Sequence, residues 1–341
     1  MPRKISPEGA KDSFKTMNQQ IQQYAKHILA GQFLERPDIV ALSELSKDNF
    51  DDLLYWANEI RKANFGNKVK MCSIVGGRLG GCSQDCAFCA QSLHYDTAVD
   101  KTPQILDDEQ IMAAAKEAKQ KGVPNFGIVY SGKKVDTGEL DRLIALTERI
   151  KAELGMGVCM SLGVVSDENM QRLSRAGVVR FNHNLETSER HFAEVVTTHK
   201  YADRVKTIEA GLKAGMGVCA GGIFGIGETE DDRIDMALQL RRLGVDMVPM
   251  NFLHPIDGTP LGKAEKLPPH EILRIVALYR FILPKTHLKV AGGRVLNLRD
   301  LQSWIFHAGC TAILTGNYLT TAGRAVEEDL QMLKDLGLKT V

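Results

Sequence analysis

The sequence has no excess of charge of either sign and no long apolar run. Its 43 Lys and Arg residues nearly balance 42 Asp and Glu residues, at a formal net charge of +1. Such a balance creates no global field for nucleic acid or for a membrane surface. No apolar run approaches the roughly 20 residues of a membrane-spanning helix, and the start MPRKISPEGAKDSFK lacks the apolar core of a signal peptide. We therefore expect a cytoplasmic protein with no nucleic acid or membrane partner.

The chain also lacks the cysteine pattern of a disulfide framework. It has seven cysteines, an odd number, and the cytosol keeps thiols reduced. Clustered cysteines in such a protein are more often metal ligands than disulfides. Charged residues make up 25% and hydrophobic residues 44% of the 341 residues, which is ordinary for a globular protein with a substantial core.

Two kinds of pattern divide the chain near residue 67. Residues 1–66 predict helices, since apolar residues recur at helical spacing and DNFDDLLYWANEIRKANFG opens with acids and closes on Gly66. From residue 67 onward, short β-branched runs alternate with longer amphipathic segments, many of which end on glycine. The predicted strands are 69–75, 125–131, 157–163, 178–184, 215–222, 245–252, 287–293 and 310–316.

Eight strands that alternate with helices imply parallel pairing, and eight such units close naturally into a (β/α)8 barrel. An open doubly wound sheet is the alternative. The sequence therefore predicts an α/β protein, a TIM-type barrel with an N-terminal helical extension. We assign 1–66 to the extension, 67–323 to the barrel and 324–341 to a C-terminal helix that packs on it.

Three cysteines lie within eight positions in GGCSQDCAFCAQS, residues 80–92: Cys82, Cys86 and Cys89. A structural zinc site needs four ligands, and His94 is the only further candidate nearby. Three thiolates instead suit a [4Fe–4S] cluster whose fourth iron stays open for chemistry. The triplet follows the first predicted strand, at the end of the barrel where active sites are built. An iron–sulfur site is the prediction, with zinc or a redox thiol as alternatives.

The triplet resembles that of the radical S-adenosylmethionine (SAM) superfamily. This resemblance implies that SAM chelates the open iron and that reduction of the cluster yields a 5′-deoxyadenosyl radical, which removes hydrogen from an unactivated C–H bond. The cofactor would then carry the hard chemistry, and the protein would position it.

Further segments resemble the biotin synthase family. They are, in chain order, CSQDCAFCAQS, FNHNLETS, TTHKYADR, VCAGGIFGIGET, NFLHPIDGTPL and AGGR. The resemblance covers nearly the whole barrel, from residue 72 to about 323. The resemblance implies conversion of dethiobiotin to biotin, an electron donor such as flavodoxin or ferredoxin, iron–sulfur assembly machinery, and a homodimer. Alternatives are a methylornithine synthase-like or hydrogenase-cofactor maturase-like enzyme of the same barrel type, or a non-catalytic metal-binding protein.

The candidate SAM and substrate residues lie in four of these segments. In FNHNLET, strand alternation sends Asn182, Asn184 and Glu186 to one face, and Phe181, His183 and Leu185 to the other. The resemblance assigns Asn184, Glu186 and Arg204 to SAM, and Asn182 and Asn251 to the substrate; the family's usual aspartate is Glu186 here. Glycines can let backbone approach a ligand closely. In GGIFGIGE, the candidates for such contacts to SAM are Gly221, Gly222, Gly225 and Gly227.

Sulfur insertion also needs a sulfur source. The resemblance implies an auxiliary [2Fe–2S] cluster held by three cysteines and an arginine, of which this chain keeps Cys159 and Cys219. The third cysteine position falls at or next to Gly127, and the arginine position aligns with Lys289. Because each interior layer of a barrel draws on alternate strands, Cys72, Cys159, Cys219 and Lys289 can face one layer. We expect Cys72, Cys159 and Cys219 to hold an auxiliary cluster, either [2Fe–2S] or larger, near Lys289, and Cys310 to be a core thiol.

Overall fold

The computed structural model of the chain describes residues 17–341. The strands are β1 (Lys68–Leu79), β2 (Gln104–Ile105), β3 (Asn125–Tyr130), β4 (Gly157–Ser161), β5 (Val178–Asn182), β6 (Gly217–Cys219), β7 (Gly222–Phe224), β8 (Met247–Phe252), β9 (His287–Val290), β10 (Ala312–Leu314) and β11 (Lys339–Thr340).

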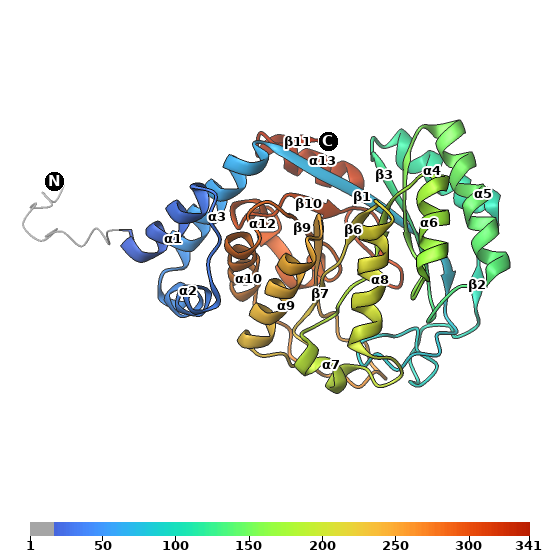
Figure 1. The fold of residues 1–341 in the computed structure, drawn as a ribbon, viewed down its shortest axis with the longest axis horizontal. Helices are drawn as coiled ribbons and strands as arrows, with labels where there is room; N and C mark the ends of the chain where they lie inside the picture. The colour runs from blue at the N-terminus through green and yellow to red at the C-terminus, as the bar shows by residue number, and fades with distance from the viewer. Residues whose placement is uncertain (1–16) are drawn as a thin grey trace, which may run out of the picture.

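Helices precede the barrel, alternate with its strands and follow it (Figure 1). They are α1 (Gln19–Leu29), α2 (Arg36–Asp48), α3 (Phe50–Phe65), α4 (Asp108–Gln120), α5 (Thr137–Leu154), α6 (Asp167–Ala176), α7 (Glu189–Val195), α8 (Tyr201–Lys213), α9 (Glu230–Leu243), α10 (Pro269–Ile282), α11 (Arg294–Leu298), α12 (Trp304–His307) and α13 (Val326–Asp335).

The strands form a closed parallel barrel in the order β1, β3, β4, β5, β6, β8, β9 and β10, and β10 pairs with β1 to complete the circle. The (β/α)8 prediction is confirmed, and each predicted strand is present. The fifth is split, since β6 and the short β7 pair in turn with the same neighbour, β8. The predicted helical extension corresponds to α1–α3; its first 16 residues lie outside the described part of the chain.

Local sequence signals explain where the barrel helices begin and end. The Asp136 carboxylate accepts from the backbone N–H of Glu139 at the start of α5, and the helix ends at Gly155, which has φ 63°. Ser166 and Gly177 bound α6 in the same way. These caps set the helices against the strands, and the main apolar core fills the layer between them.

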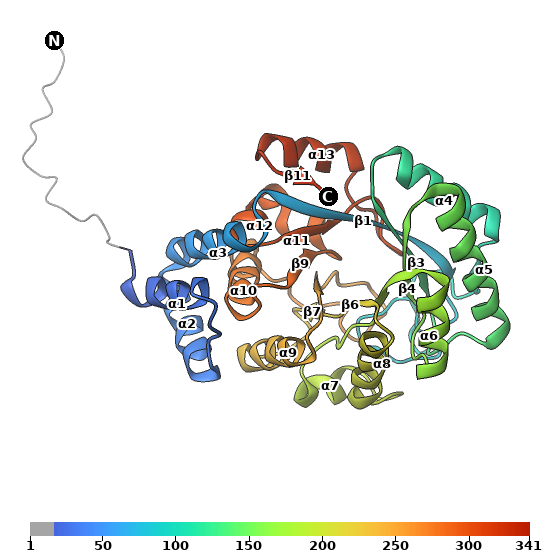
Figure 2. The same cartoon turned by 45° about the horizontal axis from the view of Figure 1, so that its top comes forward.

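The C-terminal residues close the structure beside β1 (Figure 2). α13 lies in the segment after the barrel, and its Asp329 makes a fully buried ion pair of 2.6 Å with Arg294 of α11. The chain then continues into β11, a strand that the sequence did not predict, which pairs with the start of β1. Within residues 17–341, no helix is long and apolar enough to cross a membrane.

Candidate active site

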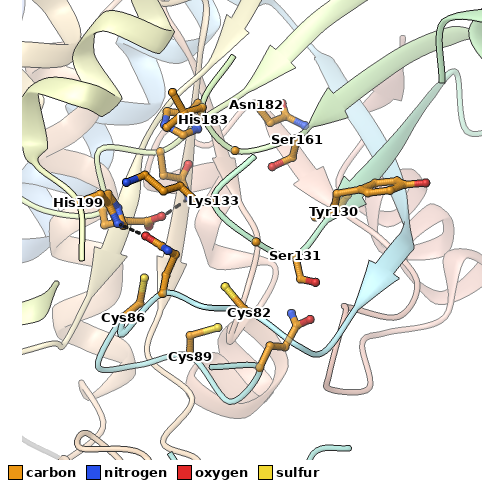
Figure 3. Close-up of a pocket in the computed structure, with 18 of the residues that line it drawn as sticks. Cys82, Cys86, Cys89, Tyr130, Ser131, Lys133, Ser161, Asn182, His183 and His199 are labelled. Carbon is orange, nitrogen blue, oxygen red and sulfur yellow. Dashed lines mark hydrogen bonds between the residues drawn. The ribbon is translucent and has the colours of Figure 1, made fainter. Parts of the chain in front are cut away.

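The cysteine triplet opens onto a cavity at the carboxyl end of the barrel strands. β1 runs directly into the loop formed by residues 80–92, which we call the cysteine loop. Cys82, Cys86 and Cys89 all line a cavity of about 280 Å³. Figure 3 shows their sulfur atoms on one side of this cavity, with Asn182 and His183 on the opposite side. Among the residues the structure describes, no group of three or more His, Cys, Asp or Glu side chains is arranged so that it could hold a single metal ion.

The cysteine loop is held in place by the segment between α7 and α8. The Asp85 carboxylate accepts hydrogen bonds from the backbone N–H and the hydroxyl of both Thr197 and Thr198. The backbone N–H of Ala87 donates to Val195 O at 2.9 Å. Burial acts to raise the pKa of Asp85, but the hydrogen bonds from the two threonines hold it well below its usual range. The loop therefore has a fixed shape before any ligand binds.

Glu186 and Arg204 form a buried ion pair above the triplet. Arg204 Nη1 donates to Glu186 Oε1 at 3.2 Å and to Asn184 O at 2.9 Å, and Asn184 Nδ2 donates to Glu186 Oε2 at 3.3 Å. The two side chains are 11% and 10% exposed. Burial raises the pKa of Glu186, while Arg204 opposes this shift. Glu186 also has φ 71°, an uncommon conformation for a residue with a side chain, and such strain is frequent at functional sites.

Two polar side chains in this cavity lack partners within the described chain. Asn182 Oδ1 and His183 Nε2 are both buried and accept or donate no hydrogen bond there. The expectation that His183 packs behind the sheet is wrong, because β5 ends at Asn182 and strand alternation stops with it. Burial lowers the pKa of His183 well below its usual value, so its ring is neutral. A ligand with polar groups would satisfy both atoms.

The glycine-rich segment owes its composition to close packing. A Cβ atom at Gly221 would lie 2.0 Å from Pro249 O, and one at Gly222 would lie 2.4 Å from Glu186 O. The Glu228 carboxylate accepts from the backbone N–H groups of Gly225 and Ile226. These contacts are a structural reason for the glycines, separate from the SAM contacts that the sequence predicts. Gly227 has φ 96° and faces the ring of His191.

Asn251 lies in a second cavity, also of about 280 Å³, which shares Phe88, Cys89 and Gln91 with the first. Its amide accepts from Gly292 N at 2.9 Å and donates to Gly222 O at 3.1 Å. A side-chain amide can make four hydrogen bonds, so half of this capacity remains for a ligand. The lining of the second cavity is less polar and includes side chains such as Ile223 and Leu314.

The remaining barrel cysteines gather beneath the first cavity. Ser161 lines that cavity, and Cys159, two residues earlier on β4, faces the same interior one layer deeper. Burial raises the pKa of Cys159 to about 12, and nearby Cys72 adds to the shift. The ammonium of Lys289 hydrogen-bonds the Cys219 thiol; burial acts to lower its pKa, but Cys219 and the other two thiols raise it above its usual value. The structure thus brings Cys72, Cys159, Cys219 and Lys289 together.

Gly127 lies at or next to the place where the family pattern has a third auxiliary cysteine, and it packs closely against β1. A Cβ atom there would lie 3.0 Å from Cγ2 of Ile74 on β1. Cys310 lies apart from the interior thiols, and its Sγ contacts Leu288 O and Ala312 O at 3.3 Å and 3.0 Å.

Comparison with known proteins places this site in a family. Residues 78–240 match the radical SAM superfamily, and residues 249–339 match the Biotin and Thiamin Synthesis associated domain. The crystal structure of a methylornithine synthase superposes with a TM-score of 0.80 at 21% identity, covering 93% of this chain and 97% of that one, which shows a shared fold. Barrel, cysteine loop and family match together define a radical SAM enzyme.

The curated relatives make the assignment narrower. The biotin synthase of Heliobacterium modesticaldum is 46% identical over 318 residues, which cover 93% of this chain and 97% of that protein. That of Geobacter sulfurreducens is also 46% identical, over 92% of this chain and 95% of the relative. The chain belongs to the biotin synthase family.

Proposed function

We propose that this chain inserts sulfur into dethiobiotin to form biotin. Family membership over more than nine-tenths of the chain supports this activity. The observation that carries it is the presence of two separate groups of three thiols in one barrel, one at the cavity mouth and one beneath its floor. When bound, a [4Fe–4S] cluster with SAM supplies the hydrogen-abstracting radical, and an auxiliary iron–sulfur cluster supplies sulfur.

The cysteine loop has the donor set of the first cluster. Cys82, Cys86 and Cys89 would hold it, and the loop contains no fourth cysteine. Burial raises the pKa of Cys86 to about 12 and raises that of Cys89 as well. These thiols therefore stay protonated until a metal displaces the protons, so cluster assembly should release protons.

Arg204, Glu186 and Asn184 are the proposed SAM residues, together with the glycine-rich segment. Arg204 uses Nε and Nη1 within the protein, and its Nη2 makes no hydrogen bond to the described residues. That nitrogen is suited to a carboxylate such as the one at the amino acid end of SAM. The Glu186 carboxylate lies beside Arg204 and carries the opposite charge. This negative charge suits the ammonium or the hydroxyl groups of the same ligand.

Asn182 and Asn251 are the proposed substrate residues. The buried Asn182 Oδ1 has no partner, and leaving such an acceptor unsatisfied costs about 1–3 kcal/mol. An N–H group of the ureido ring of dethiobiotin would satisfy it. In the second cavity, the Asn251 amide has one N–H and one oxygen lone pair left after its two backbone hydrogen bonds. These would pair with the C=O and N–H groups of the same ureido ring. Both cavities meet at Cys89, so substrate and cofactor would lie beside the cysteine loop.

Cys72, Cys159 and Cys219 are the proposed ligands of the auxiliary cluster. They are buried in one interior layer with a cationic Lys289, which would offset the negative charge of three thiolates. Ile74 packs against Gly127, at or next to which the family pattern places a third cysteine, and Cys72 lies two residues earlier on the same face of β1. A flavodoxin or ferredoxin donor, assembly proteins and a homodimer remain proposals from the family resemblance.

The activity is tested by incubating anaerobically reconstituted protein with dethiobiotin, SAM and a reductant. We expect biotin and 5′-deoxyadenosine, resolved by mass spectrometry. Deoxyadenosine without any sulfur-containing product would exclude sulfur insertion and favour another radical reaction on the same barrel. A protein that takes up zinc but neither iron nor sulfide would exclude the radical mechanism.

The auxiliary site is tested with Cys72→Ala. We expect this variant to bind less iron and sulfide while the cluster of the cysteine loop remains, because that loop does not contact Cys72. Cys310→Ala is the matched control, since Cys310 is also buried but lies among backbone carbonyls away from the interior thiols. Equal iron and sulfide in both variants and the wild type would assign Cys72 to the core.

A further inference from the structure

A hydrogen-bonded relay joins the cysteine loop to the SAM-site arginine. Gln84 lies between Cys82 and Cys86, and its Oε1 is 2.9 Å from His199 Nδ1. On the other side of the same ring, Arg204 Nε donates to His199 Nε2 at 3.1 Å. Figure 3 shows His199 at the edge of the cavity, on the side of Cys86. Neither Gln84 nor His199 is among the site residues that the sequence predicts.

Only one protonation state of the His199 imidazole is compatible with both of these hydrogen bonds. The Nε of an arginine is always a donor, so Nε2 of His199 must be unprotonated to accept from it. The ring proton then lies on Nδ1 and is donated to the Gln84 amide oxygen. An imidazolium would place a second positive charge against Arg204, and it would have no acceptor for that bond. Burial first, and then the charges of Arg204 and Lys133, lower the pKa of His199 to about 4.

Packing against the same aromatic ring fixes the relative positions of the His199 and Arg204 side chains. The Phe192 ring meets the His199 ring edge-on at 5.6 Å, and the Arg204 guanidinium lies over the same Phe192 ring at 5.7 Å. Gln84 is itself held, because its Nε2 donates to Ser83 Oγ at 3.1 Å. Each member of the relay therefore has a second contact that limits its rotation.

We propose that His199 is a positioning residue, which holds the Arg204 guanidinium at a fixed place relative to the cysteine loop. The role assigned to it is to orient Arg204, not to react. Its effect is on binding, because Arg204 meets SAM in the orientation that the loop requires only while the imidazole accepts from Nε. The inference rests on the proposed function, since it takes SAM as the ligand of Arg204.

Three variants at His199 test the relay by their affinity for SAM, measured by equilibrium dialysis on reconstituted, unreduced protein. His199→Ala should weaken SAM binding about tenfold or more, the range for losing a hydrogen bond to a charged group. The amide of His199→Gln reaches the position of Nε2, so we expect affinity within about threefold of wild type. The shorter amide of His199→Asn reaches only Gln84 and should behave like Ala.

The control is His94→Ala. His94 Nε2 lies 3.2 Å from Ser83 O, so this variant also removes a histidine contact to the cysteine loop, but one that does not involve Arg204. SAM affinity should be unchanged in this variant, and iron content should be unchanged in all four. A His199→Ala protein that binds SAM within about twofold of wild type would overturn the relay. Iron loss in that variant would also overturn it, because His199 would then support the loop itself. Wild-type protein that holds iron and sulfide yet does not bind SAM would instead overturn the proposed function.

Discussion

Glu186 connects the groups on both sides of the candidate SAM site. Its carboxylate is bonded to Arg204 and Asn184, its backbone lies against Gly222, and its φ is positive. A residue in such a conformation persists only when its surroundings determine it. The carboxylate is therefore held for its charge and its position together.

We predict that Glu186→Ala lowers the free energy of unfolding by about 3 kcal/mol, since removing one partner of a buried ion pair leaves the other charge uncompensated. Glu186→Asp, which restores the residue usual in the family pattern, should lose less than half as much. Urea unfolding of the iron-free protein measures both. Glu117→Ala, which breaks the exposed pair with Lys121, serves as the control and should be neutral. Equal losses in the Ala and Asp variants would show that side-chain length, not charge, matters at this position.

Residue types and spacing in the sequence predicted the triplet and the polar face of Asn182, Asn184 and Glu186. They did not predict that His183 joins that face, because alternation holds only along a strand and β5 ends one residue earlier. Gln84 and His199 were also missed. Their partnership spans 115 positions and depends on how the α7–α8 connection folds back over the cysteine loop, which no local signal encodes.

The cysteine loop, as an element, takes its shape from one carboxylate. Asp85 binds two consecutive threonines through four groups, so it acts as a clamp between residues 80–92 and the connection before α8. Hydrogen bonds to a charged acceptor are the stronger kind. The clamp holds the three thiols at their spacing before any iron arrives, which reduces the ordering that cluster binding requires.

We predict that Asp85→Asn loosens the loop and lowers retention of the [4Fe–4S] cluster, while the barrel stays folded. The amide can accept at only one atom, so about half of the four bonds are lost. Iron per chain, followed over hours of dialysis against a chelator, should fall several-fold faster than in wild type. Asp100→Asn is the control, because Asp100 accepts from Thr102 and Gln104 outside the clamp. Equal iron loss in both variants would remove the special role of Asp85.

The strands and their order were predictable because buried β-branched runs alternate with capped amphipathic helices. The division of the fifth strand into β6 and β7 was not. Gly221 lies so close to β8 that a Cβ atom would clash with Pro249 O, and this approach interrupts the regular ladder. A tertiary contact therefore determines a local break that resembles an ordinary glycine-rich turn in the sequence.

Across the whole molecule, the barrel is closed by contacts between segments far apart in the chain. β10 and β11 both pair with β1, and the Arg294–Asp329 ion pair ties α13 to the segment after β9. Three histidines whose pKa is lowered by full or partial burial lie in different parts of this closed structure. They are His183 at the cavity, His199 in the relay and His287 on β9.

These histidines predict how stability depends on pH. Burial lowers the pKa of His199 and of His287 to about 4, and that of His183 well below 6.5. Between pH 6.5 and pH 4, the unfolded chain binds protons at these rings and the folded chain does not. The stabilising contribution is therefore complete above the unfolded pKa and is lost as pH falls through this window. Each ring adds up to about 1.4 kcal/mol per pH unit to the slope.

We expect the free energy of unfolding of iron-free protein, measured in urea, to fall steeply from pH 6 to pH 5. His199→Gln should reduce that slope by roughly one titrating group, since it removes one buried ring and keeps an uncharged hydrogen-bonding side chain. His94→Ala, a substitution at an exposed histidine outside this set, is the control variant. A stability that stays flat from pH 7 to pH 5 would mean that these rings accept protons in the folded protein, and then the Arg204–His199 hydrogen bond could not persist there.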